Sequence, residues 1–172
     1  MARMPHLHTL DLSDDAVAAA VHRIGRSAYA VEAERIGFDG IPALGESLAE
    51  MRQTDLRWVG ASSGNGALAG FLAWAPAPDG AVSIDRLCVD PARFRRGVAS
   101  LLLRHALTEL FPDRPVEVTT GAANAPAVTL YRRMGFTRGP DFSPVPGLTM
   151  ASFRRAAEST PWEGGRGSSD LA

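Results

Sequence analysis

Two periods of hydrophobic and polar residues divide the N-terminal third of the chain into a strand and helices. Residues 6–12 alternate weakly with a period of two, which predicts a strand. Residues 13–29 follow a helical period, with Ser13 as the expected N-cap and aspartates after it, where the helix dipole favours anions. Residues 32–51 predict a short helix, a Gly/Pro turn and another helix. The apolar face of the first helix is formed by Val17, Ala20, Val21 and Ile24.

The middle of the chain is rich in strand-forming residues. Residues 56–63, 66–78 and 81–89 each predict a strand. The links between them contain the sequences SGNG and PDG, which are both favourable turn sequences. Three successive strands with such short links predict an antiparallel meander.

After the meander, helices and strands alternate. The pattern predicts a helix over residues 98–110, a strand over 115–120, a helix over 124–134 and a last strand over 147–155. The order of elements predicts a mixed α/β fold, in which helices flank a mainly antiparallel sheet. The helix at 98–110 is expected to turn one apolar face to the core, formed by Ala99, Leu102, Leu103, Ala106 and Leu110.

Composition and charge restrict the class of protein. The 172 residues are 45% hydrophobic and 22% charged, the balance of one globular domain, which we place at residues 1–155. Residues 156–172 are rich in Gly and Ser and are expected to form a disordered tail. The net charge of −1 favours neither nucleic acid nor an anionic membrane as a partner. We find no secretory segment and no apolar run of membrane length, so we expect a cytoplasmic protein.

Cysteine and histidine usage favours neither disulfides nor a metal. Cys88 is the single cysteine, and its strand-like surroundings favour a small apolar filler over a reactive thiol. The four histidines are scattered, without a spaced partner that would indicate zinc. We therefore expect no bound metal.

The segment VDPARFRRGVASLLL, residues 89–103, changes abruptly from basic and flexible to apolar and helical. Pro91 ends the strand, and Gly97 relaxes the steric limits where the loop enters the helix. Backbone N–H groups of residues 95–100 can then point at one anion, reinforced by the helix N-terminus and by two arginines. The pattern indicates a phosphate or pyrophosphate site, or else an ordinary solvated basic loop. The chain contains neither the P-loop nor the dinucleotide-binding glycine pattern.

A second motif lies 27 residues beyond Gly97, in the segment NAPAVTLYRRMGF. Together the two segments resemble the GNAT superfamily of acetyl-CoA-dependent N-acyltransferases. The family loop, [Q/R]xxGx[G/A], is matched by Gly97 and Ala99, whereas Phe94 stands where the family has Gln or Arg. The family's later N-x-x-A-x-x-L-Y-x-x-x-G-F pattern is matched at every fixed position, by Asn124, Ala127, Leu130, Tyr131, Gly135 and Phe136.

The resemblance implies roles for individual residues. Asn124 would contact the cofactor near the splay of the central strands, act as a helix N-cap, or do both. Tyr131 would act as general acid on the departing thiolate; the alternative is a half-buried aromatic on a helix face. The pantetheine arm would pair with backbone groups of Leu87, Cys88 and Val89. The pyrophosphate would bind the loop residues Arg95, Arg96, Gly97, Val98, Ala99 and Ser100.

Amine attack on a thioester also requires a proton acceptor. Asp85 is the candidate, because strict alternation places its side chain on the same side of its strand as Leu87. The alternative is that Asp85 only pairs with Arg86. The segment between the first helix and the second strand would line the acceptor pocket, and Phe142 with Pro144 would form another pocket wall. The segment between the first helix and the second strand is acidic, which favours a cationic amine as acceptor unless these side chains are simply solvated. Its acidic residues are Glu32, Glu34, Asp39, Glu46 and Glu50.

The implied function is acetyl transfer from acetyl-CoA directly to a primary amine in a ternary complex, without a metal and without a covalent enzyme intermediate. The acceptor is a small-molecule or peptide amine, with a protein lysine also open. The alternative is a catalytically inactive acyl-CoA-binding module that senses or scaffolds. By analogy with the family, the exposed edge of the last strand is a candidate homodimer contact.

Overall fold

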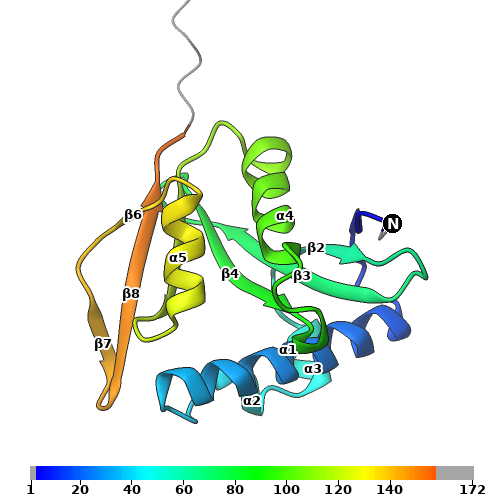
Figure 1. The fold of residues 1–172 in the computed structure, drawn as a ribbon, viewed down its shortest axis with the longest axis horizontal. Helices are drawn as coiled ribbons and strands as arrows, with labels where there is room; N and C mark the ends of the chain where they lie inside the picture. Colours follow the sequence, from blue (N-terminus) through cyan, green and yellow to red (C-terminus); the bar gives the residue numbers. More distant parts are fainter. Residues whose placement is uncertain (1–2, 158–172) are drawn as a thin grey trace, which may run out of the picture.

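The computed structural model describes residues 3–157, which form one mixed sheet with helices on both faces (Figure 1). Among these residues the sheet has eight strands in the order β1-β2-β3-β4-β5-β8-β6, with β7 paired to β8. Every pairing is antiparallel except that of β4 with β5. The predicted fold class is confirmed. The strands are β1 (His6–Thr9), β2 (Arg57–Ser62), β3 (Leu68–Pro76), β4 (Val82–Val89), β5 (Val116–Gly121), β6 (Thr137–Arg138), β7 (Phe142–Val145) and β8 (Leu148–Arg155).

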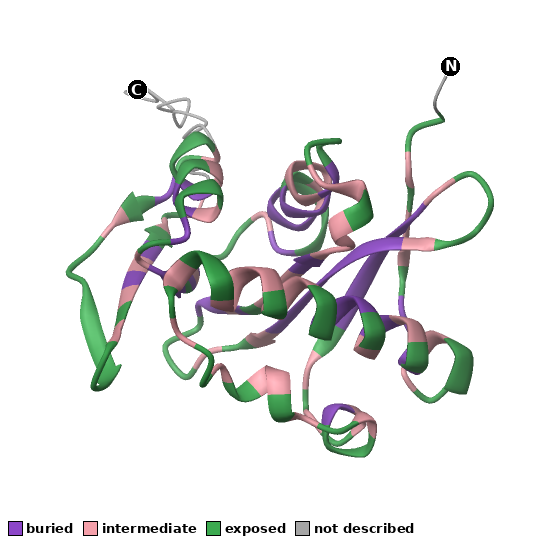
Figure 2. Cartoon of the chain, turned by 60° about the horizontal axis from the view of Figure 1, so that its bottom comes forward, coloured by how far each residue is buried: buried purple, intermediate pink, exposed green. Residues whose placement is uncertain are grey.

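The helices divide between the two faces of the sheet, and buried residues concentrate on the central strands between them (Figures 1 and 2). One face carries α1 (Asp15–Ile36), α2 (Pro42–Gly45) and α3 (Leu48–Arg52). The other face carries α4 (Val98–His105), its π-helical continuation η2 (Ala106–Leu110), and α5 (Ala125–Arg133). A single 3-10 turn, η1 (Pro91–Arg93), connects β4 to the loop before α4.

Helix α1 is longer than the sequence pattern indicates, and its N-cap differs from the prediction. Asp14, not Ser13, caps the helix, because its carboxylate accepts from the N–H groups of Ala16 at 2.9 Å and Val17 at 3.2 Å. The Ser13 hydroxyl donates instead to Asp11. The helix ends where Gly37 adopts a left-handed conformation with φ of 64°. Residues 32–36 therefore continue α1 rather than beginning a separate helix.

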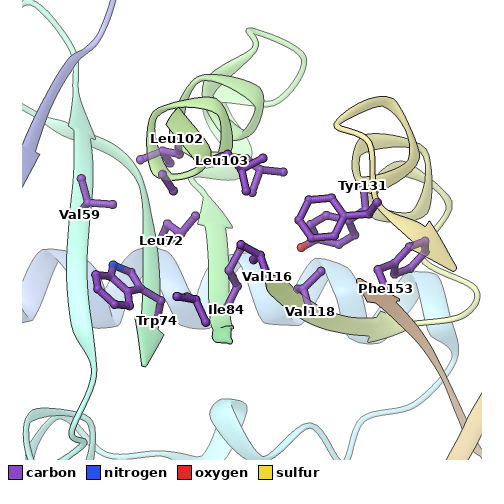
Figure 3. Packing of buried hydrophobic residues seen from close by; sticks show 14 of the residues in the cluster. Val59, Leu72, Trp74, Ile84, Leu102, Leu103, Val116, Val118, Tyr131 and Phe153 are labelled. Carbon is purple, nitrogen blue, oxygen red and sulfur yellow. The ribbon is translucent and has the colours of Figure 1, made fainter. Parts of the chain in front are cut away.

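Two hydrophobic clusters, one on each face of the sheet, hold the layers together. Figure 3 shows the cluster below α4, where Leu72 and Ile84 lie near Leu102 and Leu103. The opposite cluster joins α1 to the sheet and contains Trp58 and Phe71, whose rings lie 5.6 Å apart. Alternate residues of the meander supply both clusters, as expected for strands covered on two sides.

Leu110 was predicted to lie on the core-facing side of its helix. This prediction is wrong, because the residue is 37% exposed. Helix α4 ends in a π turn, in which the N–H of Phe111 donates to the carbonyl of Ala106. This wider turn changes the phase of the apolar face. Leu107 and Phe111 are buried instead, and the Phe111 ring meets Trp74 edge-on at 5.1 Å.

The predicted meander is confirmed, but β4 contains a β-bulge. Trp74 of β3 pairs with Ile84, and Ala73 pairs with Arg86, so Asp85 is an extra residue in β4. The bulge reverses the alternation, because Ile84 and Leu87 now pack against the same cluster. The prediction that the side chains of Asp85 and Leu87 lie on the same side of β4 is therefore wrong.

Strands β4 and β5 pair over only a short stretch and then separate (Figure 1). Their parallel register joins Val82 to Val116, Ser83 to Glu117 and Ile84 to Val118. Beyond this point β5 continues to pair with β8 as far as Gly121, and β4 continues to pair with β3 as far as Val89. The inner edges of the two strands thus form an opening in the middle of the sheet, which we call the splay.

Strands β6 and β7 were not predicted, because each is short. The hairpin of β7 with β8 leaves Phe142 44% exposed, and Pro144 is exposed beside it. Of the predicted tail, residues 158–172 lie outside the described residues. No helix within residues 3–157 has both the length and the apolar composition to cross a membrane.

Candidate functional site

Two hollows meet at the splay. The first, the loop hollow, has a volume of about 540 Å³ and lies between α1, the end of β4, the loop at residues 93–100 and α5. The second, the sheet hollow, has a volume of about 700 Å³ and lies between α1, α2 and strands β4, β5 and β8. Six residues line both hollows, and we call them the junction: Tyr29, Glu32, Leu87, Asn124, Ala127 and Tyr131.

The loop before α4 has the geometry of an anion site. Arg95 and Gly97 adopt left-handed conformations with φ of 64° and 75°, which turn the chain sharply into the helix. Gly97 is the N-cap and provides no side chain to satisfy the first N–H groups of α4. The N–H groups of Val98, Ala99 and Ser100 have no intrahelical acceptor, since the first turn of a helix lacks them. These backbone groups line the loop hollow, where the positive end of the helix dipole favours an anion.

Arginines surround this loop. Of the described residues, four arginines line the loop hollow, and they come from three separate segments. Arg96, which was predicted to bind the same anion, is exposed and is not part of the lining. The four lining arginines are Arg35, Arg93, Arg95 and Arg133.

Phe94, the residue that departs from the family loop, has a structural partner. The guanidinium of Arg35, near the end of α1, lies 5.4 Å from the centre of the Phe94 ring. This is the distance of a cation–π contact. An aromatic side chain at this position therefore brings a positive charge to the loop from a distant helix.

The inner edge of β4 lines the loop hollow at Leu87, Cys88 and Val89. These residues pair on one side with Leu72, Phe71 and Gly70 of β3, whereas their other side faces the splay. The thiol of Cys88 is buried, and burial, as the largest cause, raises its pKa to about 12. Cys88 is thus a protonated filler, as expected, while its backbone belongs to the hollow.

Asn124 is the N-cap of α5, one of the two roles that the sequence left open, and it also lines the junction. Its side-chain oxygen accepts from the N–H of Ala127 at 3.4 Å, which makes it the N-cap of α5. Its side-chain nitrogen donates to the hydroxyl of Thr120 at 3.5 Å, and Thr120 in turn donates to Glu32 at 3.4 Å. This chain of hydrogen bonds joins α5, β5 and α1 across the junction.

Tyr131 is both a core residue and a lining residue. It is 5% exposed, and its ring packs against Phe136 and Phe153 at 5.6 Å and 5.4 Å between centres (Figure 3). Burial raises the pKa of the phenol well above its usual value, and the negative charge of Glu32 contributes to this. Within residues 3–157 no buried polar side-chain atom lacks a partner, and no hydrogen bond from this hydroxyl is found. The protonated hydroxyl therefore opens onto the hollows.

Asp85 lines the sheet hollow but not the loop hollow, and it pairs with Arg86 at 3.0 Å, as the alternative interpretation expected. Arg86 also makes a bidentate contact with Glu46, at 2.5 and 2.8 Å, and stacks over Trp58. The guanidinium lowers the pKa of Glu46. The contact joins β4 to the segment between α2 and α3, so it fixes this wall of the sheet hollow.

The acidic residues of the N-terminal half separate into two groups. Glu34 and Asp39 are exposed and line neither hollow. The carboxylates that line the sheet hollow are Glu32, Glu46, Glu50 and Asp85. Of the charged residues described, Arg86 is the one cation in this lining. The described residues contain no group of three or more histidine, cysteine or acidic side chains placed to hold a metal.

Sequence reasoning missed Thr120, Arg86 as a wall residue, and the position of Glu32 at the junction. Each depends on a contact between distant segments, such as the 88 residues that separate Thr120 from Glu32. A local pattern does not contain that information. The reversed alternation at Asp85 has a local cause, the β-bulge, but the sequence of β4 contains no pattern that reveals a bulge.

Comparison with known proteins supports one family. A family model described as "Acetyltransferase (GNAT) family" matches residues 20–136. The UPF0157 protein YqkA of Bacillus subtilis is 35% identical over 126 residues, which are 73% of this chain and 36% of that protein. A mycothiol acetyltransferase of Mycolicibacterium vanbaalenii is 34% identical over 127 residues, 67% of this chain and 42% of that protein. The chain thus spans about two fifths of the length of these relatives.

Solved structures share the fold. The ribosomal-protein-S18-alanine N-acetyltransferase of Escherichia coli superposes with a TM-score of 0.71 at 19% identity, covering 93% of this chain and 98% of that one. The PaiA N-acetyltransferase of Thermoplasma acidophilum, solved in complex with coenzyme A, has a TM-score of 0.67 at 13% identity, covering 87% and 98%. At these identities the likeness shows the fold alone.

Proposed function

Because the chain belongs to the Acetyltransferase (GNAT) family, we propose that it transfers the acetyl group of acetyl-CoA directly to a primary amine. The observation that carries this proposal is the continuity of the site. An uncapped helix N-terminus, a free strand edge and a protonated tyrosine follow one another from the loop hollow to the junction. A phosphorylated, extended thioester fits such a path.

The loop hollow would hold the donor. The N–H groups of Val98, Ala99 and Ser100, with the surrounding arginines, suit a pyrophosphate. The free edge of β4 at Leu87, Cys88 and Val89 suits the amide groups of the pantetheine arm, which would pair with it as an added strand does. This path ends at the junction, beside Tyr131.

Tyr131 would donate its proton to the departing thiolate. The phenol keeps this proton at neutral pH, because burial raises its pKa. The raised pKa makes the phenol a weaker acid, but the same desolvation also raises the proton affinity of the departing thiolate, so the two groups stay matched for proton transfer as the C–S bond breaks. Direct transfer is also supported by Cys88, whose buried and protonated thiol is a poor nucleophile.

The sheet hollow would hold the acceptor amine. Its carboxylates favour a cationic small-molecule or peptide amine over an anionic one. Asp85 is the proton acceptor that the sequence proposes, and it lies in this hollow paired with Arg86. We propose that an amine enters here and meets the thioester at the junction.

The test is calorimetric titration with acetyl-CoA, followed by measurement of thiol release over a panel of primary amines. Micromolar binding with turnover on at least one amine is expected. Binding without turnover on any amine would favour the inactive acyl-CoA-binding module instead. Failure to bind acetyl-CoA would contradict both functions.

A further inference from the structure

We propose that Glu32 is a catalytic residue that accepts the proton of the attacking amine at the junction. This assignment rests on the proposed acetyl transfer and concerns a residue that the family motifs do not contain. It makes helix α1 a part of the catalytic machinery as well as a wall of the site.

Glu32 lies where the two hollows meet. The amine nitrogen and the thioester carbonyl carbon react only where the two hollows meet, because each reactant occupies one of them. Of the described residues that line both hollows, Glu32 is the one carboxylate. Asp85 and Glu46 line the sheet hollow but not the loop hollow. Glu32 is therefore the carboxylate nearest to both reactants.

A hydrogen bond orients the carboxylate of Glu32. The hydroxyl of Thr120, which is 6% exposed, donates to Oε1 of Glu32 at 3.4 Å. Thr120 is itself contacted by the side chain of Asn124. In the described part of the chain no donor is found for Oε2 of Glu32, so one oxygen is held and the other is available.

Glu32 also differs from Asp85 and Glu46 in its partners. Asp85 and Glu46 both pair with Arg86, so each already has a cationic partner. The guanidinium also lowers the pKa of Glu46. Within residues 3–157 Glu32 makes no ion pair within 4 Å. The charge of Glu32 nevertheless reaches the junction, since it adds to the effect of burial in raising the pKa of Tyr131.

A cationic amine first gives up one proton to solvent. The lone pair of the resulting neutral amine forms the C–N bond with the acetyl carbon, and the C–S bond breaks. The proton lost by the amine nitrogen passes to Oε2 of Glu32, and the thiolate takes the proton of Tyr131. Proton exchange with solvent then restores Glu32 and Tyr131.

The pH dependence of this step depends on every charged group that lines the two hollows. The loop hollow contributes cations, and the sheet hollow contributes anions around one cation. Besides Glu32, the titratable and charged groups are Tyr29, Arg35, Glu46, Glu50, Asp85, Arg86, Cys88, Arg93, Arg95, Tyr131 and Arg133.

The experiment compares Glu32→Gln with Asp85→Asn and with Glu34→Gln, a control on the same helix that lines neither hollow. The best amine of the panel serves as acceptor. Glu32→Gln should lower kcat by about 10²-fold or more and remove the acidic limb of the pH–rate profile. The Kd for acetyl-CoA should change less than about threefold, and Glu34→Gln should match the wild type.

A second pair of variants tests the orientation without removing the carboxylate. Thr120→Val, which keeps the shape of the side chain, should lower kcat about tenfold with little change in KM, whereas Thr120→Ser should restore it. Thr120 is a positioning residue in this account. Equal kcat for Thr120→Val and Thr120→Ser would contradict the orientation argument.

The assignment is overturned if Glu32→Gln keeps kcat within threefold of the wild type, or if Asp85→Asn alone removes the acidic limb. These outcomes leave acetyl transfer intact, because the wild type still turns over. A wild type that binds no acetyl-CoA overturns the proposed function first, and the assignment of Glu32 with it.

Discussion

The loop hollow and the sheet hollow meet at one junction but are lined by groups of opposite charge. The loop hollow presents backbone N–H groups and arginines, whereas the sheet hollow presents carboxylates around the single guanidinium of Arg86. Under the proposed function, this opposite charge would give an anionic donor and a cationic acceptor separate entrances. A chain with a net charge of only −1 thus presents two adjoining hollows of opposite charge.

The largest effect is expected from a substitution that places a negative charge in the loop hollow. Gly97→Glu should weaken acetyl-CoA binding at least 10²-fold, because a carboxylate would stand where the helix N-terminus attracts the pyrophosphate. Calorimetric titration measures this change. A Cβ at Gly97 would meet no atom of the protein within 4 Å, so the surrounding chain leaves room for the new side chain.

Gly97→Ala is the matched control for that variant. It imposes the same cost of a left-handed conformation, about 1 kcal/mol, without a charge. It should lower stability slightly and leave binding within about fivefold. Equal loss of binding in both variants would show that backbone conformation, and not charge, governs the loop.

The next effect tests the junction itself. Tyr131→Phe should lower kcat by about one to three orders of magnitude, since it removes the proton donor and keeps the packing of the ring against Phe136 and Phe153. The Kd for acetyl-CoA should stay within about threefold. Steady-state kinetics with calorimetry separates the two quantities, and an unchanged kcat would reject the role of the phenol.

A smaller effect concerns the wall of the sheet hollow. Glu46→Gln should lower the free energy of unfolding by about 1–3 kcal/mol at neutral pH, because the bidentate contact with Arg86 loses its charge. Arg86 lowers the pKa of Glu46 from its ordinary value of 4.5, so the contact stabilises the fold above that value and is lost as pH falls through the lowered pKa. Urea unfolding should show the difference from wild type shrinking below about pH 4.5. A difference that does not change with pH would contradict the charged contact.

The smallest effect concerns the arginine that Phe94 brings to the loop. Arg35→Ala should raise the Kd for acetyl-CoA about two- to fivefold and reduce its dependence on salt, as expected for one exposed cation. Phe94→Leu should have a similar effect. The double variant should be no worse than either single one, and simple additivity would mean that the two residues act separately.

The loop hollow was largely predictable from sequence, and the sheet hollow was not. Gly97, Asn124 and Tyr131 belong to local patterns, and a helix start or a helix face follows from spacing within about ten residues. The contacts of Arg86 with Glu46 and of Thr120 with Glu32 join segments 40 and 88 residues apart.

Local irregularities account for the remaining differences. The bulge at Asp85 reversed the alternation of β4, and the π turn after His105 moved Leu110 out of the core. Both features insert one residue into a regular period, so every later position changes face. Periodicity alone does not reveal such insertions.

A crystal structure of the protein with coenzyme A tests the central claim most directly, because it requires no knowledge of the acceptor. The account predicts the pyrophosphate on the N–H groups of Val98, Ala99 and Ser100, and the sulfur at the junction within about 3.5 Å of the Tyr131 hydroxyl. A pyrophosphate bound away from the start of α4, or a sulfur outside the junction, would contradict it.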